Sequence, residues 1–255
     1  MMYLIIAVLC SVAVSVLLKI LRQKNIDIRQ TIVAGYPVAF LLTWVLLKPD
    51  VGAIHALDSA WAIIIALGIL LPAVFIILGR AIEAVGMVAT DASQRLSLII
   101  PIVAAFLLFG EVLTGTRILG LALGFLALGA LVYRPQHNDI TRQAKHTPLW
   151  LFGVWAGYGI IDILFKQVAK QGAAFPLTLL VSFGVAGVLL LIYLLVTGVR
   201  WQKEALMTGL LLGALNMGNI YAYVRAHQVL HDSPSIVFTG MNVGVIAVAT
   251  LIGVG

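Results

Sequence analysis

The chain carries one long helical pattern twice, and this internal repeat constrains its fold more than any other feature. A shift of 147 residues aligns Lys19 with Lys166, and a shift of 145 residues aligns Arg80 with Arg225. The register therefore changes by only two residues, which one connection between helices can absorb. Internal repeats in a membrane chain are typical of transporters, whose binding site lies where the two halves meet.

The composition is that of a membrane protein. Hydrophobic residues make up 62% of the chain, charged residues only 10%, and the mean hydropathy is +1.10. A soluble domain of this length needs far fewer apolar side chains. The net charge of +6 comes from basic residues between apolar stretches, where they set topology and contact lipid headgroups, so nucleic acid is not an expected partner. Cys10 is the only cysteine, which excludes a disulfide framework.

Nine apolar stretches have about the 20 residues that a helix needs to cross the hydrocarbon core. The first lacks the basic segment and cleavage site of a signal peptide, so we expect it to be retained as a helix. The longest polar segment, 134–147, divides the chain into a first unit at 1–133 and a second at 148–255. The nine expected helices lie at about 2–21, 30–48, 60–82, 86–109, 115–133, 148–169, 174–198, 205–226 and 234–254.

The first unit has five of these helices and the second has four. Gly255 aligns with Gly110, just before the fifth helix, so we expect a tenth helix to be missing from this chain. An odd number of helices per unit makes the two units insert with opposite orientations. The sequence thus predicts an all-α, polytopic membrane helix bundle of two inverted five-helix repeats.

The distribution of basic residues predicts the orientation. The connections after the first, third, fifth and seventh helices hold ten Lys and Arg, and the others hold five. The positive-inside rule then places the first set in the cytoplasm and the N-terminus outside. The expected location is the cell membrane, specifically a bacterial inner membrane.

Two segments carry a family resemblance. One, LGRAIEAVGMVATDASQRLSLIIP, is followed by AAFLLFGE at 104–111, and the other reads VRAHQVLHDSPSIVFTGMNVGVIAVATLIGVG near the end of the chain. They resemble the third-to-fourth helix signature of EamA-type members of the drug/metabolite transporter superfamily. The resemblance covers essentially the whole chain. It implies ten helices in two inverted five-helix units around a central substrate cavity.

An intramembrane carboxylate, Asp162, is the first candidate for function, because a charge at the bilayer centre costs about 2.5–3.5 kcal/mol on insertion scales. Trp155, Tyr158 and Lys166 fall on the same face of the sixth helix. This face could form a cavity wall on which Asp162 binds a cation or a proton. A self-contained pair of Asp162 with Lys166, one helical turn apart, is an equal alternative.

The first and fourth helices offer further polar candidates. Ser15 holds the position of Asp162 in the repeat, and hydroxyl residues also serve ordinary close helix packing. Asp91 and Arg95 are one turn apart, so they could neutralise each other. We favour a cavity role for Arg95, whose guanidinium suits a carboxylate or phosphate, and packing or pairing for Asp91.

Asparagines in the eighth and ninth helices complete the candidate set. Asn216 and Asn219 share a face with Tyr223, and Asn242 occupies the repeat position of Ser97. Amides in hydrocarbon need partners, so hydrogen bonds between helices are as reasonable as a polar cavity lining.

Other motifs point away from catalysis. The histidines lack the spacing of metal ligands, and no GxSxG, HExxH or phosphate-binding loop occurs, so we expect neither an enzyme nor a metal or cofactor. Gly120 and Gly124 form a small-residue pattern that favours close packing, with a homodimer contact as the alternative.

These features predict a secondary transporter that moves a small polar or amphipathic metabolite by alternating access, with Asp162 as the candidate for proton coupling. Uncoupled facilitation is equally compatible with the sequence. Its partners would be the small-molecule substrate and membrane lipids. A flippase for a lipid-linked substrate and a non-transporting membrane interaction protein remain alternatives. The predicted cavity, formed by the first, fourth, sixth, eighth and ninth helices, is lined by Ser15, Arg95, Tyr158, Asp162, Asn216, Asn219 and Asn242.

Overall fold

A computed structural model describes residues 1–52, 61–97, 147–170, 175–230 and 234–253, together with a few single positions between them. The expected fifth helix at 115–133 lies outside these residues apart from three positions, and the pair Gly120 and Gly124 lies outside them as well. Residues 134–146 of the linker lie outside them as well. The helix count and the repeat therefore stay predictions.

The described residues form helices and their connections, without a strand, so this part of the protein is all-α. Six of the helices (α1, α2, α3, α7, α8 and α9) are long and apolar enough to cross a bilayer, which identifies a membrane protein. The helices are α1 (Met2–Gln23), α2 (Ile28–Leu47), α3 (Trp61–Val85), α4 (Met87–Leu96), α7 (Thr147–Lys170), α8 (Phe175–Val196), α9 (Lys203–Val229) and α10 (Pro234–Gly253).

Large apolar side chains cover the outside of the bundle as well as its inside. Val196 of α8 is 81% exposed and Leu251 of α10 is 78% exposed, whereas Leu194 and Leu67 are fully buried. In water such an outer surface would favour aggregation, but in a bilayer it faces lipid tails. Burial in this bundle therefore reflects packing between helices more than transfer from water.

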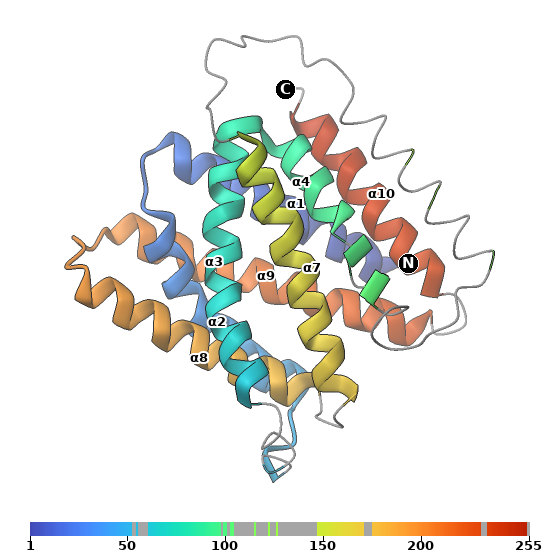
Figure 1. The fold of residues 1–255 in the computed structure, drawn as a ribbon, viewed down its shortest axis with the longest axis horizontal. Coiled ribbons are helices and arrows are strands. Elements are labelled where there is room, and N and C mark those ends of the chain that lie inside the picture. Colours follow the sequence, from blue (N-terminus) through green and yellow to red (C-terminus); the bar gives the residue numbers. More distant parts are fainter. Residues whose placement is uncertain are drawn as a thin grey trace.

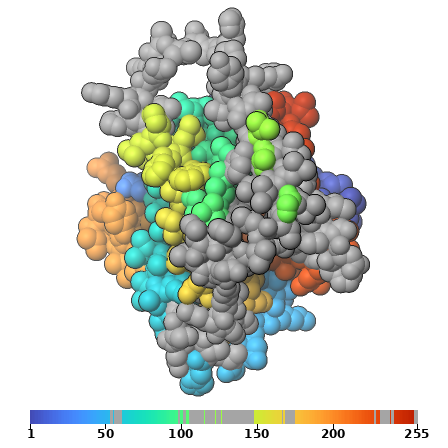
Figure 2. Space-filling model, turned by 45° about the vertical axis from the view of Figure 1, so that its right-hand side comes forward, coloured from blue at the N-terminus to red at the C-terminus, as the bar shows by residue number. Residues whose placement is uncertain are grey.

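Helices from the first half of the chain pack against helices from the second half (Figure 1). α2 packs against α8 and α9, α1 against α9 and α10, and α3 against α7 and α8. α4 lies between α7 and α10, and Figure 2 shows α7 in yellow adjoining α3 and α4 in teal and green on one face. The two halves of the sequence are thus interleaved rather than separate.

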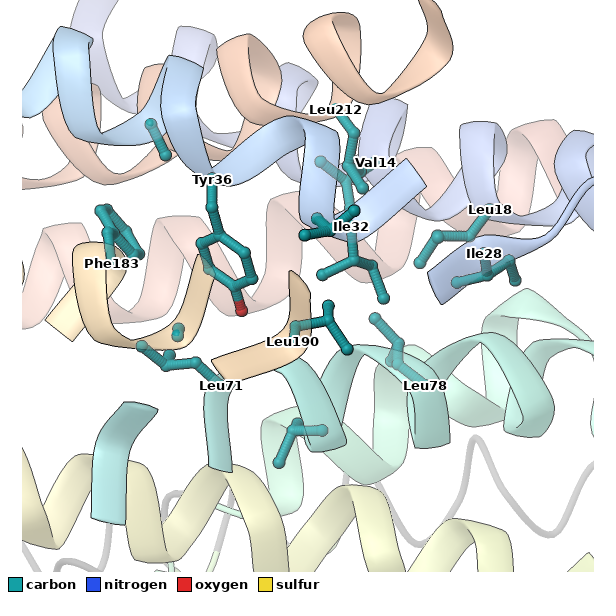
Figure 3. Close-up of a cluster of buried hydrophobic side chains, with 14 of the residues drawn as sticks. Val14, Leu18, Ile28, Ile32, Tyr36, Leu71, Leu78, Phe183, Leu190 and Leu212 are labelled. Atoms are coloured by element: carbon teal, nitrogen blue, oxygen red, sulfur yellow. The ribbon is translucent and has the colours of Figure 1, made fainter. Parts of the chain in front are cut away.

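The main core lies where α1, α2, α3, α8 and α9 meet. Tyr36 of α2 points between Phe183 and Leu190 of α8, as Figure 3 shows, and its ring centroid lies 6.1 Å from that of Phe183. Leu18 of α1 and Leu78 of α3 are buried in the same cluster. This cluster joins helices from both halves of the chain.

Glycines permit the closest helix crossing, that of α2 with α9. A Cβ atom on Gly209 would lie 2.5 Å from the carbonyl oxygen of Thr31, and one on Gly213 would overlap the backbone of Gly35. Such distances leave no room for a side chain on either glycine. In α3, Gly68 makes the corresponding approach to α8, where a Cβ atom would lie 2.5 Å from a methyl group of Val185.

The connection from α1 to α2 is fastened to the connection from α8 to α9. The Gln30 side chain donates to the carbonyl oxygen of Arg200 at 2.8 Å and accepts from the backbone N–H of Gln202 at 2.8 Å. In return, the Gln202 side-chain oxygen accepts from the backbone N–H of Asp27 at 3.0 Å. The end of α3 lies at the same face, because Arg22 pairs with Glu83 at 3.5 Å. Three connections that the basic-residue distribution placed on one side therefore lie together.

Candidate functional site

α4 is the polar element of the bundle. It begins after Gly86, whose φ of 82° lies in the region that favours glycine, and the hydroxyl of Thr90 donates to the Gly86 carbonyl at 2.8 Å. The helix carries Asp91 and Arg95 on successive turns, and its far end is held by Trp155 of α7, which donates to the carbonyl of Leu96 at 3.1 Å. Packing against α1, α7 and α10 keeps these polar side chains away from lipid.

Asp91 is paired with α1 rather than with its neighbour on α4. It is 1% exposed, and one carboxylate oxygen accepts a hydrogen bond of 2.9 Å from the hydroxyl of Ser15, itself 3% exposed. Hydrogen bonds to a charged group are worth about 1.5–3 kcal/mol. The Ser15–Asp91 contact therefore both fixes α4 on α1 and partly compensates the cost of a buried carboxylate.

Arg95 lies between α1 and α7, on faces that the expected repeat would align. Its guanidinium donates to the hydroxyl of Ser11 at 3.1 Å and interacts electrostatically with Asp91, Tyr158 and Asp162. Among the residues that the structure describes, Arg95 forms no direct ion pair with either aspartate. The sequence allowed Asp91 and Arg95 to neutralise each other. In the structure each of them instead forms a hydrogen bond with a serine of α1, Asp91 with Ser15 and Arg95 with Ser11.

Two polar atoms at this site are buried without a protein partner. They are one carboxylate oxygen of Asp91 and the Nε of Arg95. An unsatisfied buried donor or acceptor costs about 1–3 kcal/mol, and more for a charged group. One acceptor and one donor are therefore available to a bound polar molecule or to water.

Helix geometry places the site deep in the bundle. Arg95 stands nine residues after Gly86, and Ser15 stands eight residues before the end of α1 at Gln23. At 1.5 Å per residue these separations are about 12–14 Å, close to half of a hydrocarbon core of about 30 Å. Asp162 lies eight residues before the end of α7 at Lys170, at a similar depth.

The structure brings four of the seven predicted site residues into one neighbourhood. Ser15, Arg95, Tyr158 and Asp162 lie around the end of α4, linked by the hydrogen bond and electrostatic contacts above. Asn219 lies on α9, where its side-chain oxygen is buried without a partner. The side chain of Lys166, the alternative partner of Asp162, lies outside the described part of the structure.

The two remaining asparagines are placed differently. Asn216 lines a separate cavity of about 20 Å³ between α2, α3 and α9, together with Tyr36 and Gly213. That volume suits about one water molecule. Asn242 is partly buried on α10, which packs against both α1 and α4.

Asp91 and Ser11 are polar partners that the predicted site left out. The spacing of Asp91 and Arg95 indicated a pair within one helix, because sequence alone gives no sign of which helix approaches that face. A usable signal did exist for Ser11. It is the repeat counterpart of Tyr158, and both residues now interact with Arg95.

Comparison with known proteins gives a family relationship. No family model matches the chain, and no solved structure matches it. An uncharacterized protein of Haemophilus influenzae is 49% identical over 255 residues, an alignment that covers 98% of this chain and 87% of that protein. Identity at this level over nearly the whole chain shows common descent and a common fold. The chain therefore belongs to the same family as this Haemophilus influenzae protein.

Proposed function

We propose that the protein is a secondary transporter of the EamA type, which moves a small polar or amphipathic metabolite across the membrane by alternating access. The observation that carries this proposal is the cluster of Arg95, Asp162 and the buried Asp91 within an apolar helix bundle. Intramembrane charges are rare and usually line substrate or ion pathways. The partnerless atoms of this cluster favour a transient ligand over a purely structural network.

The packing pattern supports the two-repeat architecture on which the proposal depends. The repeat equates α1 with α7, α2 with α8, α3 with α9 and α4 with α10. Exchanging the units turns the α1–α9 contact into the α7–α3 contact, and the α2–α9 contact into the α8–α3 contact, and all of these contacts occur. The α1–α10 and α4–α7 contacts exchange in the same way. Such an exchange is expected of two repeats related by a two-fold axis.

The loop contacts support opposite orientations of the two units. α1 and α8 both end at the face where Gln30 bonds to Arg200 and Gln202. α7 immediately precedes α8, so if both helices span the bilayer, α7 runs opposite to α8 and therefore opposite to its repeat counterpart α1. This is the arrangement of inverted repeats, which lets the two units rock about a shared site.

The charges at the site indicate the substrate class. Arg95 offers a guanidinium with fixed donors to a carboxylate or phosphate, and the carboxylates of Asp91 and Asp162 can accept an ammonium group or a proton. Because Arg95 is not directly paired with either aspartate, a substrate carrying both charge signs can contact both. We therefore propose a zwitterionic metabolite such as an amino acid, with Asp162 as the proton-coupling residue.

Flux into proteoliposomes tests the function. The purified full-length protein is reconstituted with and without an imposed pH gradient, and uptake of labelled amino acids is compared with that of labelled neutral sugars. We expect amino-acid flux that rises with the gradient, falls at least tenfold in Arg95→Gln, and loses its gradient dependence in Asp162→Asn. Glu204→Gln is the matched control, since Glu204 is an exposed carboxylate at the start of α9.

Three outcomes would contradict parts of the proposal. Gradient-dependent flux that persists in Asp162→Asn would remove the coupling role. Movement of a fluorescent lipid-linked sugar between leaflets, without amino-acid flux, would identify a flippase instead. Absence of flux for any class in protein that a thermal-unfolding assay shows to be folded would favour a non-transporting interaction protein.

A further inference from the structure

A second polar site lies at the face where α1 and α3 end and α2 begins, distinct from the mid-membrane cluster. It is a cavity of about 340 Å³. Its charged lining consists of the side chains Arg22, Asp27, Arg29, Arg80 and Glu83. Three guanidiniums and two carboxylates thus surround one space, with a formal excess of one positive charge.

Of the three arginines around the cavity, one is closely paired with a carboxylate and two are not. The guanidinium of Arg29 donates two hydrogen bonds to the carboxylate of Asp27, from Nε to Oδ1 at 3.1 Å and from Nη2 to Oδ2 at 2.8 Å. Burial raises the pKa of Asp27, but the hydrogen bonds from Arg29 and the charges of Arg29 and Arg22 outweigh it and lower the pKa overall. Asp27 therefore stays ionised and committed to Arg29.

Arg22 and Arg80 are only weakly paired by comparison. Both approach the same oxygen of Glu83, at 3.5 Å and 3.9 Å, and neither makes the two-pronged contact of which a guanidinium is capable. The Nε of Arg22 is buried without a partner. Two like charges that share one distant carboxylate oxygen repel each other, and an additional anion between them would relieve that repulsion.

The position of the cavity defines the kind of anion. Arg22 lies at the end of a membrane-spanning helix and Arg29 at the start of the next, so the cavity is at the level of lipid headgroups. Basic pockets between helix ends at this level are suited to phosphate groups of anionic lipids. A phosphate has three or more oxygens, enough to accept from Arg22 and Arg80 together.

The geometry points to a binding site for a phosphate-bearing anion between the ends of α1 and α3, held by the guanidiniums of Arg22 and Arg80 and opposed by the carboxylate of Glu83. This inference does not depend on transport. An anionic phospholipid and free phosphate share the recognised chemistry, and the experiment separates them.

The test is native mass spectrometry of the full-length protein in detergent, titrated with phosphatidylglycerol or, for comparison, the zwitterionic phosphatidylcholine. We expect phosphatidylglycerol to bind in preference, with an affinity that falls about tenfold in Arg22→Gln and in Arg80→Gln, because each loses a charge-assisted contact. Glu83→Gln should bind several-fold more tightly, since it releases both guanidiniums. Arg200→Gln is the control, because it removes one positive charge from the same face but outside the cavity.

Added inorganic phosphate distinguishes the sources. Displacement of phosphatidylglycerol by millimolar phosphate would identify a free anion as a ligand, and resistance to it would identify the lipid headgroup. If Arg22→Gln does not fold, Arg22→Lys replaces it, since it keeps the charge but loses Nε and should still weaken binding. Equal affinities in the Arg22, Arg80 and Arg200 variants, or weaker binding in Glu83→Gln, would overturn the assignment.

Discussion

Replacing Gly213 by alanine tests the crossing of α2 and α9, which joins the two halves of the chain. A Cβ atom at this position would overlap the backbone carbonyl of Gly35 and would lie 2.9 Å from its Cα. The obstructing atoms belong to a backbone, so no rotamer change can remove the clash. Gly35 cannot be made smaller either, so the two helices have to move apart.

The expected cost follows from two opposing effects. Overpacking of a tight interface costs about 1–3 kcal/mol, and a clash with rigid backbone belongs near the upper value. Alanine in place of glycine within a helix recovers about 1 kcal/mol. The free energy of unfolding should therefore fall by about 2 kcal/mol, which corresponds to a drop of about 4–8 °C in the unfolding temperature for a chain of this size.

The chain provides its own probe and control for this measurement. Cys10 is the only thiol and is partly buried, so a thiol-reactive dye reports unfolding in detergent with one site per molecule. Gly184→Ala is the matched control, because its Cβ atom would meet the ring of Phe40 on the same helix α2 at an ordinary 3.5 Å. That variant should unfold at the same temperature as the wild type or slightly above it. An unfolding temperature of Gly213→Ala equal to or above that of Gly184→Ala would refute the reasoning.

Two further substitutions probe polar contacts with the same assay. Ser15→Ala should destabilise the protein by about 1.5–3 kcal/mol, because Asp91 loses its hydrogen-bond donor, and the effect should largely disappear when Asp91 is already alanine and no acceptor remains; additive effects in that double variant would exclude the coupling. Asp27→Asn should keep the cap of α2 but lose the ion pair with Arg29. Because folding lowers the pKa of Asp27, the pair stabilises the protein above the usual carboxyl pKa and the benefit is lost as the pH falls through the lowered value. The variant should therefore be less stable than the wild type at pH 7 and indistinguishable from it in strong acid, and a difference that grows on acidification would contradict the sign.

The apolar runs predicted where the helices lie, because the length of hydrocarbon to be crossed fixes their length. The first helix was expected at about 2–21 and spans Met2–Gln23, and the second was expected at 30–48 and spans Ile28–Leu47. The expected and observed helices differ at their ends, because polar contacts determine where a helix begins and ends. The side chain of Asp27 caps α2 by accepting from the backbone of Arg29, and this brings the helix start forward.

The candidate site was less predictable, because a sequence pattern gives the face of a helix but not the helix that covers it. Spacing placed Arg95 and Asp162 on polar faces, and the structure brings those faces together. Spacing also put Asn216 beside Asn219, yet Asn216 lines a small cavity towards α2 and α3. One helical turn of separation allows two residues to face different neighbours when three helices surround the same segment.

A charge network that only stabilises the fold and a binding site differ in how completely their buried polar atoms are hydrogen-bonded. A network that serves only stability gains from satisfying every buried atom, since each omission costs about 1–3 kcal/mol. Here Asp91 and Arg95 are each held by one serine of α1, which fixes their positions, while each keeps one buried atom free. Positioned but incompletely satisfied charges are what a site needs if it is to bind a polar molecule and then release it.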